Sequence, residues 1–288
     1  MLFSIVSSGI GIGALYGLLA LGYFLFFQAT TAINFAIGAI AMFAGMAMAV
    51  VSQDMSLPWA IGILVAVALA VLLAWISEAA ILRPILARSS DEFGAVVAIV
   101  ALMFVIEQLA GVIFGRRPIQ GRQLFDAVHF VGDGIIESRF LWNTVISVIV
   151  FAVVVAWLKH GSYGRMLRAA GDNETAARVL GLPIRRIKFA AVFATGLVCA
   201  VAGVLYVSQA PLNFHSHLAF AIAGFIAFVI GGTGSAWAPL VGGILLGLIE
   251  AFTIWFLGGG ARDYMLLLLV LVVFSVRPEG IFTVRVRT

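Results

Sequence analysis

Long apolar stretches separated by short polar ones dominate the chain. Asp54 is the only charged residue before Glu78, and a second charge-free stretch runs from Phe189 to Ile249. These stretches are apolar on every face of a helix, whereas a membrane β-barrel alternates apolar and polar residues. A helix of about 20 apolar residues crosses the hydrocarbon of a bilayer. The pattern therefore predicts membrane-spanning helices and excludes a water-soluble fold.

Nine apolar segments can be placed along the chain. They lie at 5–27, 33–52, 58–82, 93–115, 140–158, 189–210, 218–232, 237–257 and 263–276. The segments 218–232 and 263–276 are short, and short, Gly-interrupted segments are typical of broken or re-entrant helices beside a transport path. We therefore expect an all-α polytopic membrane protein with eight or nine transmembrane helices, some short or broken, in a single domain over residues 1–288.

The composition removes several other classes of protein. Hydrophobic residues make up 63% of the chain and charged residues only 10%, against about 25% charged residues in soluble domains. The single cysteine, Cys199, excludes an internal disulfide and a Cys-based zinc site. The net charge of +4 comes from basic residues beside apolar spans, which indicates membrane topology and not a nucleic-acid surface.

Positive charge predicts the orientation of the spans. Twelve of the 17 Lys and Arg residues lie in 83–92, in 159–188 and in the tail from Arg277. Because cytoplasmic loops are enriched in Lys and Arg, these three regions are expected inside the cell. Nine crossings then place the N-terminus outside the cell. Because the sequence fits either eight or nine spans, the side of the N-terminus stays open.

Small residues recur every four positions in three of the expected helices. Such rows let helix backbones approach closely in lipid, so they predict a tightly packed bundle. The rows are Gly9, Gly13 and Gly17, then Ala41, Gly45 and Ala49, and then Gly243 and Gly247.

The polar stretch 159–188 predicts a short helix over residues 173–180. Asp172 or Asn173 can cap its start, and Glu174 places negative charge in the first turn. Gly181 is suited to the position after the helix end, where a left-handed backbone is common. Basic residues flank this helix, which fits either a docking element for a partner or an interfacial helix held by lipid headgroups.

Motifs for catalysis or nucleotide binding are absent from the sequence. It holds no phosphate-loop motif, no H-E-x-x-H, no G-x-S-x-G and no G-x-G-x-x-G. The histidines His215 and His217 form an H-x-H pair without a third ligand, which indicates a polar loop more than a metal site. We therefore expect no enzyme activity, no cofactor and no metal.

At the polar loop the sequence resembles the coupling loop of ABC importer permeases of the branched-chain amino-acid type. The family pattern G-R-x-x-R-A-x-x-x-D-x-x-A-A-x-x-x-G-I is matched from Gly164 to Gly181, with Leu182 in place of Ile. The resemblance extends over nearly the whole chain. Further matching motifs are Tyr16–Gly22, Ile33–Ala36, Arg83-Pro84 with Arg88, Gly231–Ser235, Gly242-Gly243 with Gly247 and Glu250, and Arg277–Gly280.

The resemblance implies an ABC importer permease fold and a place in an ATP-driven importer. Two permease subunits, of which the second is expected to be a paralogue, would form the path across the bacterial inner membrane. They would dock two cytoplasmic ABC ATPase subunits, which bind the ATP, and would receive solute from a periplasmic binding protein. Branched-chain or other amino acids, amides, urea and aromatic acids are solutes of this family. Coupling to the ATPase is expected at Arg165, Arg168, Asp172, Glu174, Ala177 and Gly181.

One departure from the family pattern leaves the solute open. Many relatives have Asn-Phe-Ala-His-Gly near the start of the second helix, whereas this chain has Ile37 in place of the imidazole. The region is consequently less polar here. The sequence therefore does not assign a particular amino acid as the solute.

Polar and glycine residues within the spans are candidates for the translocation path. Asn34 is expected to face protein or a cavity, because an amide that faced lipid would leave its hydrogen-bonding groups unused; the alternative is that it caps a half-helix. The glycine run permits an irregular backbone that needs protein or water around it. The path residues expected here are Asn34, Gly38, Gly231, Gly232, Gly234 and Ser235.

Two acids, Glu107 and Glu250, lie deep in expected spans. They fit either an ion relay or a structural hydrogen bond between helices. An ion relay would indicate the alternative function, an ion-coupled secondary transporter. That function leaves the coupling-loop pattern unexplained.

Overall fold

The structure is a computed structural model that describes residues 2–53, 55, 57–88, 92–121, 128–131 and 134–276. Nine of its helices are apolar segments that match the nine segments expected from the sequence. They are α1 (Leu2–Thr30), α2 (Ala36–Gln53), α3 (Trp59–Ile76), α5 (Glu92–Ile113), α6 (Ser138–His160), α9 (Ile184–Val207), α10 (Ser216–Gly231), α11 (Ala238–Leu257) and α12 (Arg262–Val276).

Shorter elements connect these helices. A π-helical turn follows α3 directly and leads into α4, and a hairpin of two strands precedes α6. These elements are η1 (Ser77–Leu82), α4 (Arg83–Arg88), β1 (Val128–Val131), β2 (Gly134–Glu137), α7 (Ser162–Asp172), α8 (Glu174–Val179) and the 3₁₀ turn η2 (Gly259–Ala261).

Seven helices of the described chain are long and apolar enough to cross a membrane. The helix α10 has 16 residues and α12 has 15, so both are shorter than a full span. These are the two segments that the sequence predicted to be short. The all-α membrane fold with short helices among the spans is therefore confirmed.

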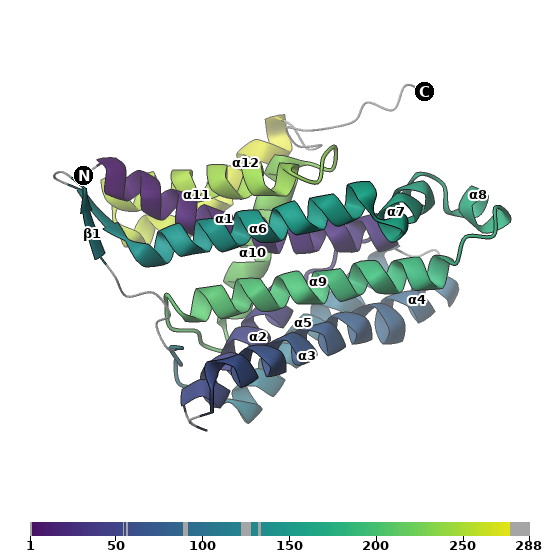
Figure 1. The fold of residues 1–288 in the computed structure, drawn as a ribbon, viewed down its shortest axis with the longest axis horizontal. Coiled ribbons are helices and arrows are strands. Elements are labelled where there is room, and N and C mark those ends of the chain that lie inside the picture. The colour runs from purple at the N-terminus through teal and green to yellow at the C-terminus, as the bar shows by residue number, and fades with distance from the viewer. Residues whose placement is uncertain are drawn as a thin grey trace.

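The long helices lie side by side along one direction, and α10 runs across them (Figure 1). The N-terminus and the β1–β2 hairpin lie at one end of this bundle, which we call the hairpin end. The helices α7 and α8 lie at the opposite end, which we call the α8 end. Since the helices cross the bilayer, the two ends correspond to its two faces.

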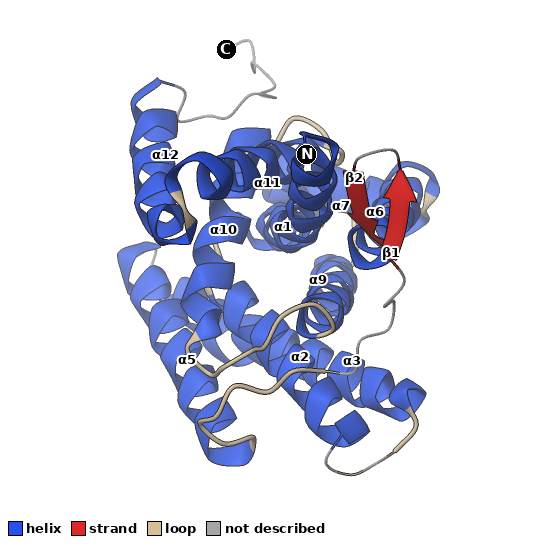
Figure 2. Ribbon diagram, turned by 90° about the vertical axis from the view of Figure 1, so that its left-hand side faces the viewer, coloured by secondary structure: helices blue, strands red, loops and turns tan. Residues whose placement is uncertain are grey.

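The centre of the bundle is formed by α1 and α2. Over an 18-residue apolar stretch of each of these helices 83% of the residues are buried, against 28% in such a stretch of the span that contains α3 and 33% in those of α5 and α6. Figure 2, which looks along many of the helices, shows α1 between α11 and α6. The outer helices therefore turn most of their apolar side chains toward lipid or partner subunits.

Glycines bring the backbones of α1 and α11 into direct contact. A Cβ atom added at Gly13 would lie 2.7 Å from the carbonyl oxygen of Gly243, and one added at Gly243 would overlap the backbone of Gly17. A second contact of this kind joins α2 and α9, where a Cβ at Gly45 would lie 2.6 Å from the oxygen of Gly203. The rows predicted from the sequence thus serve as packing surfaces.

At the hairpin end, loops are fastened to one another by backbone hydrogen bonds. The strands β1 and β2 pair antiparallel, with Val128 opposite Glu137. The segment after α5 pairs with the α9–α10 loop, because Ile119 and Leu212 exchange two N–H···O bonds of 2.8 Å. These bonds position the start of α10, which follows Leu212 closely.

Some of the sequence motifs lie outside the described residues. These are the closing motif Arg277–Gly280 and the basic tail. The structure also leaves out the side chains of Arg88, Asp172 and Glu174.

We predict that Gly243→Leu prevents stable packing of α11 on α1. The added side chain would overlap the α1 backbone, and overpacking costs about 3 kcal/mol or more when no side chain can move aside. The measurements are the yield of monodisperse protein in detergent and the thermal unfolding midpoint. Gly260→Leu is the matched control, since nothing lies within 4 Å of a Cβ at that position. Equal stability of the two variants would contradict the packing role of Gly243.

Candidate functional site

The helix α8 is a short, well-capped helix at the tip of the segment between α6 and α9 (Figure 1). The Asn173 side-chain oxygen accepts a hydrogen bond from the Ala176 N–H at 2.9 Å, which caps the start of the helix. At the other end Gly181 has a φ of 76°. Its N–H donates to the Arg178 oxygen at 3.0 Å, and the Leu182 N–H donates to the Ala177 oxygen at 3.0 Å. This pair of bonds is a Schellman motif, so both predicted helix ends are confirmed.

The same helix has one buried side and one exposed apolar side. Ala177 is 2% exposed and packs into the core of the protein, whereas Val179 and Leu180 are 83% and 79% exposed. Caps at both ends hold the backbone that carries these two side chains in one conformation. The helix therefore offers a rigid apolar surface that the described chain leaves uncovered.

The preceding helix α7 connects this surface to the bundle. Leu167 is buried, and a Cβ at Gly171 would lie 3.3 Å from the Gln28 side-chain oxygen near the end of α1. The predicted coupling residues Arg165 and Arg168 are exposed, and Arg165 donates to the His160 carbonyl oxygen at 2.5 Å. The helix α7 thus links α8 to the end of α1, the central helix.

The Asn34 amide is buried, and its oxygen and its nitrogen each make a hydrogen bond to a protein group. Asn34 is 1% exposed. Its oxygen accepts a hydrogen bond from the Ala36 N–H at 3.0 Å, and its nitrogen donates to the Ser77 hydroxyl at 3.0 Å. The amide therefore caps the start of α2 and fastens it to η1, which agrees with the half-helix alternative. A role of Asn34 in the path stays a prediction.

The glycine run between α10 and α11 forms the turn that joins these two helices. Gly232 has a φ of 80° and a ψ of −178°, a backbone region essentially restricted to glycine. Gly234 lies within this turn, and the exposed Ser235 hydroxyl accepts from the Trp237 N–H at 3.3 Å. A Cβ at Gly231 would overlap the Ala238 carbonyl oxygen. The run thus allows a sharp turn and close packing.

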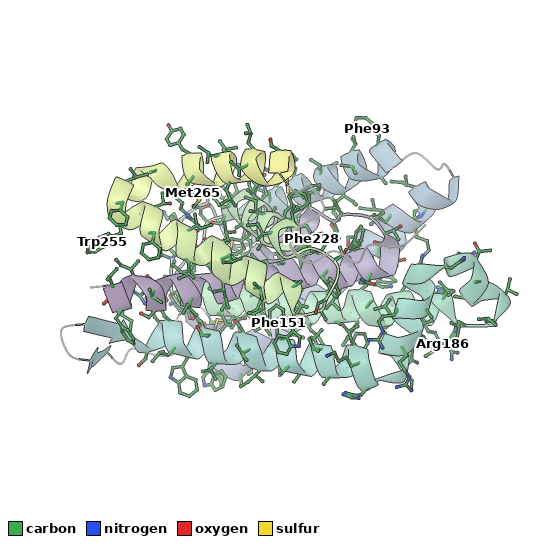
Figure 3. All side chains as sticks on the ribbon, turned by 90° about the horizontal axis from the view of Figure 1, so that it is seen from above. Phe93, Phe151, Arg186, Phe228, Trp255 and Met265 are labelled. Carbon is green, nitrogen blue, oxygen red and sulfur yellow. The ribbon has the colours of Figure 1, made fainter. Side chains whose placement is uncertain are left out.

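Gly38 and the glycine run both lie against α10, at different points along it. A Cβ at Gly38 would lie 2.6 Å from the His217 oxygen, at the start of α10, whereas Gly231 ends that helix. Aromatic rings pack between α10 and its neighbours: the Phe35 and Phe225 centroids are 5.2 Å apart, and Phe228, labelled in Figure 3, stacks on Tyr23. The transverse helix is therefore what connects the two predicted path regions.

Glu250 belongs to a buried polar triad with Tyr16 and Arg262. The Tyr16 hydroxyl donates to one carboxylate oxygen of Glu250 at 2.7 Å. The Arg262 Nε atom lies 2.7 Å from the other oxygen, and its Nη2 donates to the Tyr16 hydroxyl at 2.7 Å. Three helices meet here, since Tyr16 is in α1, Glu250 in α11 and Arg262 at the start of α12. The carboxylate is therefore neutralised by the protein itself.

The triad lines a cavity of about 220 Å³ toward the hairpin end. Arg139 and Gln209 also line it, and Arg139 forms an ion pair with Glu137. Sequence reasoning missed Tyr16 and Arg262 as partners of Glu250. The sequence did contain a signal for Arg262. An acid inside a span requires a cation or a donor near the same depth, and Arg262 stands at the start of the next helix.

Glu107 is the buried carboxylate of a second polar cluster, at the start of α10. Its two oxygens lie 2.6 Å from His215 Nδ1 and 3.6 Å from His217 Nε2. The other ring nitrogen of His217 is 3.2 Å from the Phe214 carbonyl oxygen. The H-x-H pair, which the sequence indicated as a polar loop, thus holds the start of α10 against α5.

Known proteins with similar sequences cover nearly the whole chain. The family model described as "Branched-chain amino acid transport system / permease component" matches residues 5–276. The high-affinity branched-chain amino acid transport system permease protein LivH of Salmonella typhimurium is 26% identical over 289 residues, which cover 95% of this chain and 93% of LivH. BraD of Pseudomonas aeruginosa, a permease protein of the same kind of system, is 25% identical with the same coverage.

A solved structure supports the fold. The complex "PsaBC from Streptococcus pneumoniae in complex with Fab" contains a chain that aligns with a TM-score of 0.51 at 13% identity, over 94% of this chain and 91% of that one. The family resemblance read from the coupling loop and the glycine motifs is confirmed by these matches. The chain is a multi-pass membrane protein that belongs to the family of branched-chain amino acid transport system permease components.

Proposed function

We propose that the chain is a membrane-spanning permease subunit of an ATP-driven importer in the bacterial inner membrane, with the α8 end in the cytoplasm. The single observation that carries the proposal is the exposed apolar surface of α8, held rigid by caps at both ends. Such a surface fits a groove on a cytoplasmic ATPase, where ATP is bound and hydrolysed. Family membership and the basic residues around α8 support the same orientation.

The ATPase would act on the path through α7 and α1. Closure of two ATPase subunits would move α8, and α7 would transmit that motion to the end of α1 near Gln28. The α1 glycines contact the α11 backbone, and Tyr23 of α1 donates to the Ala221 oxygen of α10 at 3.0 Å. A shift of α1 therefore reaches α10, the element that adjoins both predicted path regions.

A second permease, expected to be a paralogue, would complete the path, and a periplasmic binding protein would deliver the solute. The solute is a small organic molecule of the branched-chain amino acid, amide, urea or aromatic acid class. Ile37 is fully buried and packs beside Gly22 of α1. An apolar residue at this place offers the solute no imidazole. It therefore fits an importer in which the binding protein, and not the permease, selects the solute.

The two deep acids support a structural role and not an ion relay. Glu250 is compensated by Arg262 and Tyr16, and Glu107 faces two imidazoles. A carboxylate that must bind and release a driving ion needs a vacant coordination sphere in one state. The triad arrangement around Glu250 instead ties α12 to α1 and α11.

We predict that uptake requires the partner ATPase. In proteoliposomes that contain the chain, its genomically adjacent permease and ATPase subunits and the binding protein, solute uptake should depend on enclosed ATP. The measurement is uptake of radiolabelled leucine, urea and benzoate as representatives of the solute classes. Uptake by the chain alone under an ion gradient would contradict the proposal and favour a secondary transporter.

We predict that Gly181→Val uncouples the ATPase. A left-handed backbone costs a residue with a Cβ roughly 1–2 kcal/mol, so co-purification of the ATPase should weaken by about tenfold. Gly115→Val is the matched control, because Gly115 has a φ of 87°, has nothing within 4 Å of its Cβ position and follows the end of α5, at the hairpin end. Normal co-purification and normal solute-stimulated hydrolysis in Gly181→Val would show that α8 is not the docking element.

We predict that Glu250→Gln destabilises the protein through Arg262. The substitution leaves the Arg262 guanidinium without its carboxylate. Breaking a fully buried ion pair costs about 3–5 kcal/mol. Because the Arg262 side chain is 30% exposed, we expect the free energy of unfolding to fall by about 2 kcal/mol. The double variant Glu250→Gln, Arg262→Gln should recover most of the unfolding midpoint and the transport. An ion relay predicts the opposite outcome, which is loss of transport in both variants without recovery.

A further inference from the structure

A cleft of about 760 Å³ opens at the α8 end between the end of α3, η1, α7 and the start of α9. This volume lies within the range of about 300–1,000 Å³ that is common for ligand sites. Six of its lining residues are aromatic or basic, namely Trp75, Arg83, Tyr163, Arg185, Arg186 and Phe189. The cleft lies apart from the exposed α8 surface and from the clusters around Glu107 and Glu250.

The cleft has an excess of positive charge. Arg83 forms a two-fold contact with Glu78, at 3.1 Å from Nε and 2.6 Å from Nη2, and the Glu78 side chain is only 3% exposed. That pair is electrically neutral. Arg185 and Arg186 are both exposed and lie in the first turn of α9. Two positive charges therefore remain available to an anion in the cleft.

The basic residues lie at the level where the spans end. Arg83 stands near the end of the apolar stretch Trp59–Ile85, and Arg185 and Arg186 stand at the beginning of Ile184–Val207. Figure 3 places Arg186 at the α8 end, opposite Trp255. The arginines thus lie where the polar headgroups of one leaflet meet the protein.

The aromatic residues continue the cleft toward the hydrocarbon. Trp75 precedes Arg83 by eight positions, which corresponds to about 12 Å along a helix. The Trp75 and Phe189 side chains are 43% and 48% exposed. The cleft is therefore basic at the level of the lipid headgroups and apolar at the level of the upper acyl chains. This gradient matches an amphipathic ligand and not a free ion.

We propose that this cleft binds an anionic phospholipid from the leaflet at the α8 end. The phosphate lies against Arg185 and Arg186, whose planar guanidinium groups can each donate two hydrogen bonds to phosphate oxygens. The acyl chains follow Trp75 and Phe189. Basic pockets between membrane helices and interfacial Trp and Tyr residues are the features by which proteins hold such lipids.

A lipid in this cleft would bridge α7 to α3, two helices that make few direct contacts within the described residues. Tyr163 is in α7, Trp75 in α3, and Arg185 and Arg186 are in α9. The bound lipid would therefore fix the base of α7, the helix that carries α8, against the bundle. This step does not depend on the proposed transport function, because it concerns only a chain that spans a membrane.

The proposal is tested by native mass spectrometry of the full-length chain in detergent, titrated with phosphatidylglycerol. The double variant Arg185→Gln, Arg186→Gln should raise the apparent Kd by about 30-fold, since each basic residue near an anionic surface contributes about fivefold. The matched control is Arg116→Gln, Arg117→Gln, which removes two adjacent exposed arginines at the hairpin end and should leave the Kd of this site unchanged. The variant Arg185→Lys, Arg186→Lys should have a Kd between those of the original chain and the glutamine variant. It tests the proposal even if the glutamine variant does not fold.

Three results would overturn the proposal. Phosphatidylcholine that binds as tightly as phosphatidylglycerol would show that the arginines do not select an anion. Inorganic phosphate at millimolar concentration that displaces phosphatidylglycerol completely would identify a free-anion site. Unchanged phosphatidylglycerol binding in the glutamine variant, together with lost co-purification of an ATPase, would make the cleft a protein-docking surface.

Discussion

The close backbone contact between α1 and α11 at Gly13, Gly17 and Gly243 is the interaction on which the rest of the structure depends. Lipid chains are as apolar as leucine, so the hydrophobic effect does not drive helices together inside a bilayer. Dispersion contacts between backbones replace it, and they require residues without side chains at the contact. The same device holds α2 to α9 at Gly45 and Gly203. The central position of α1 and α2 follows from these two contacts.

The transverse helix α10 packs against this centre. With 16 residues, α10 is too short to span the bilayer along the direction of the other helices. It lies against α2 at Gly38 and against α1 at Gly224, where a Cβ would lie 2.7 Å from the Leu19 Cβ. At its start His217 lies 3.6 Å from Glu107, and at its end the Gly232 N–H donates to the Phe228 carbonyl oxygen. A helix that touches so many elements can respond to a movement of any of them.

Buried charges fasten the two short helices to the bundle. An acid in the middle of a membrane costs about 2.5–3.5 kcal/mol on insertion scales, and this cost is offset where a cation or donor is held beside it. Arg262 begins α12 and binds Glu250, and His215 precedes α10 and binds Glu107. The two short helices thereby gain directional contacts that apolar packing does not supply.

The two ends of the bundle differ in the surfaces that they present. The α8 end carries the exposed apolar surface of α8, exposed arginines and the basic cleft. The hairpin end carries paired loops, the β1–β2 hairpin and the cavity beside the Tyr16–Glu250–Arg262 triad. The α8 end thus presents exposed apolar and basic side chains, while the hairpin end holds ion pairs such as Arg262–Glu250 and Arg139–Glu137.

The sequence by itself determined the nine apolar helices and both ends of α8, because hydrophobic length and helix caps depend on residues within a few positions of one another. Asn173 and Ala176, or Gly181 and Arg178, are three residues apart, and the glycine rows repeat within one helix. The tertiary structure alone decided the partners of Asn34 and Glu250 and the transverse path of α10. Asn34 and Ser77 are separated by 43 positions and Tyr16 and Glu250 by 234, and pairing over such distances depends on the way several helices pack at once.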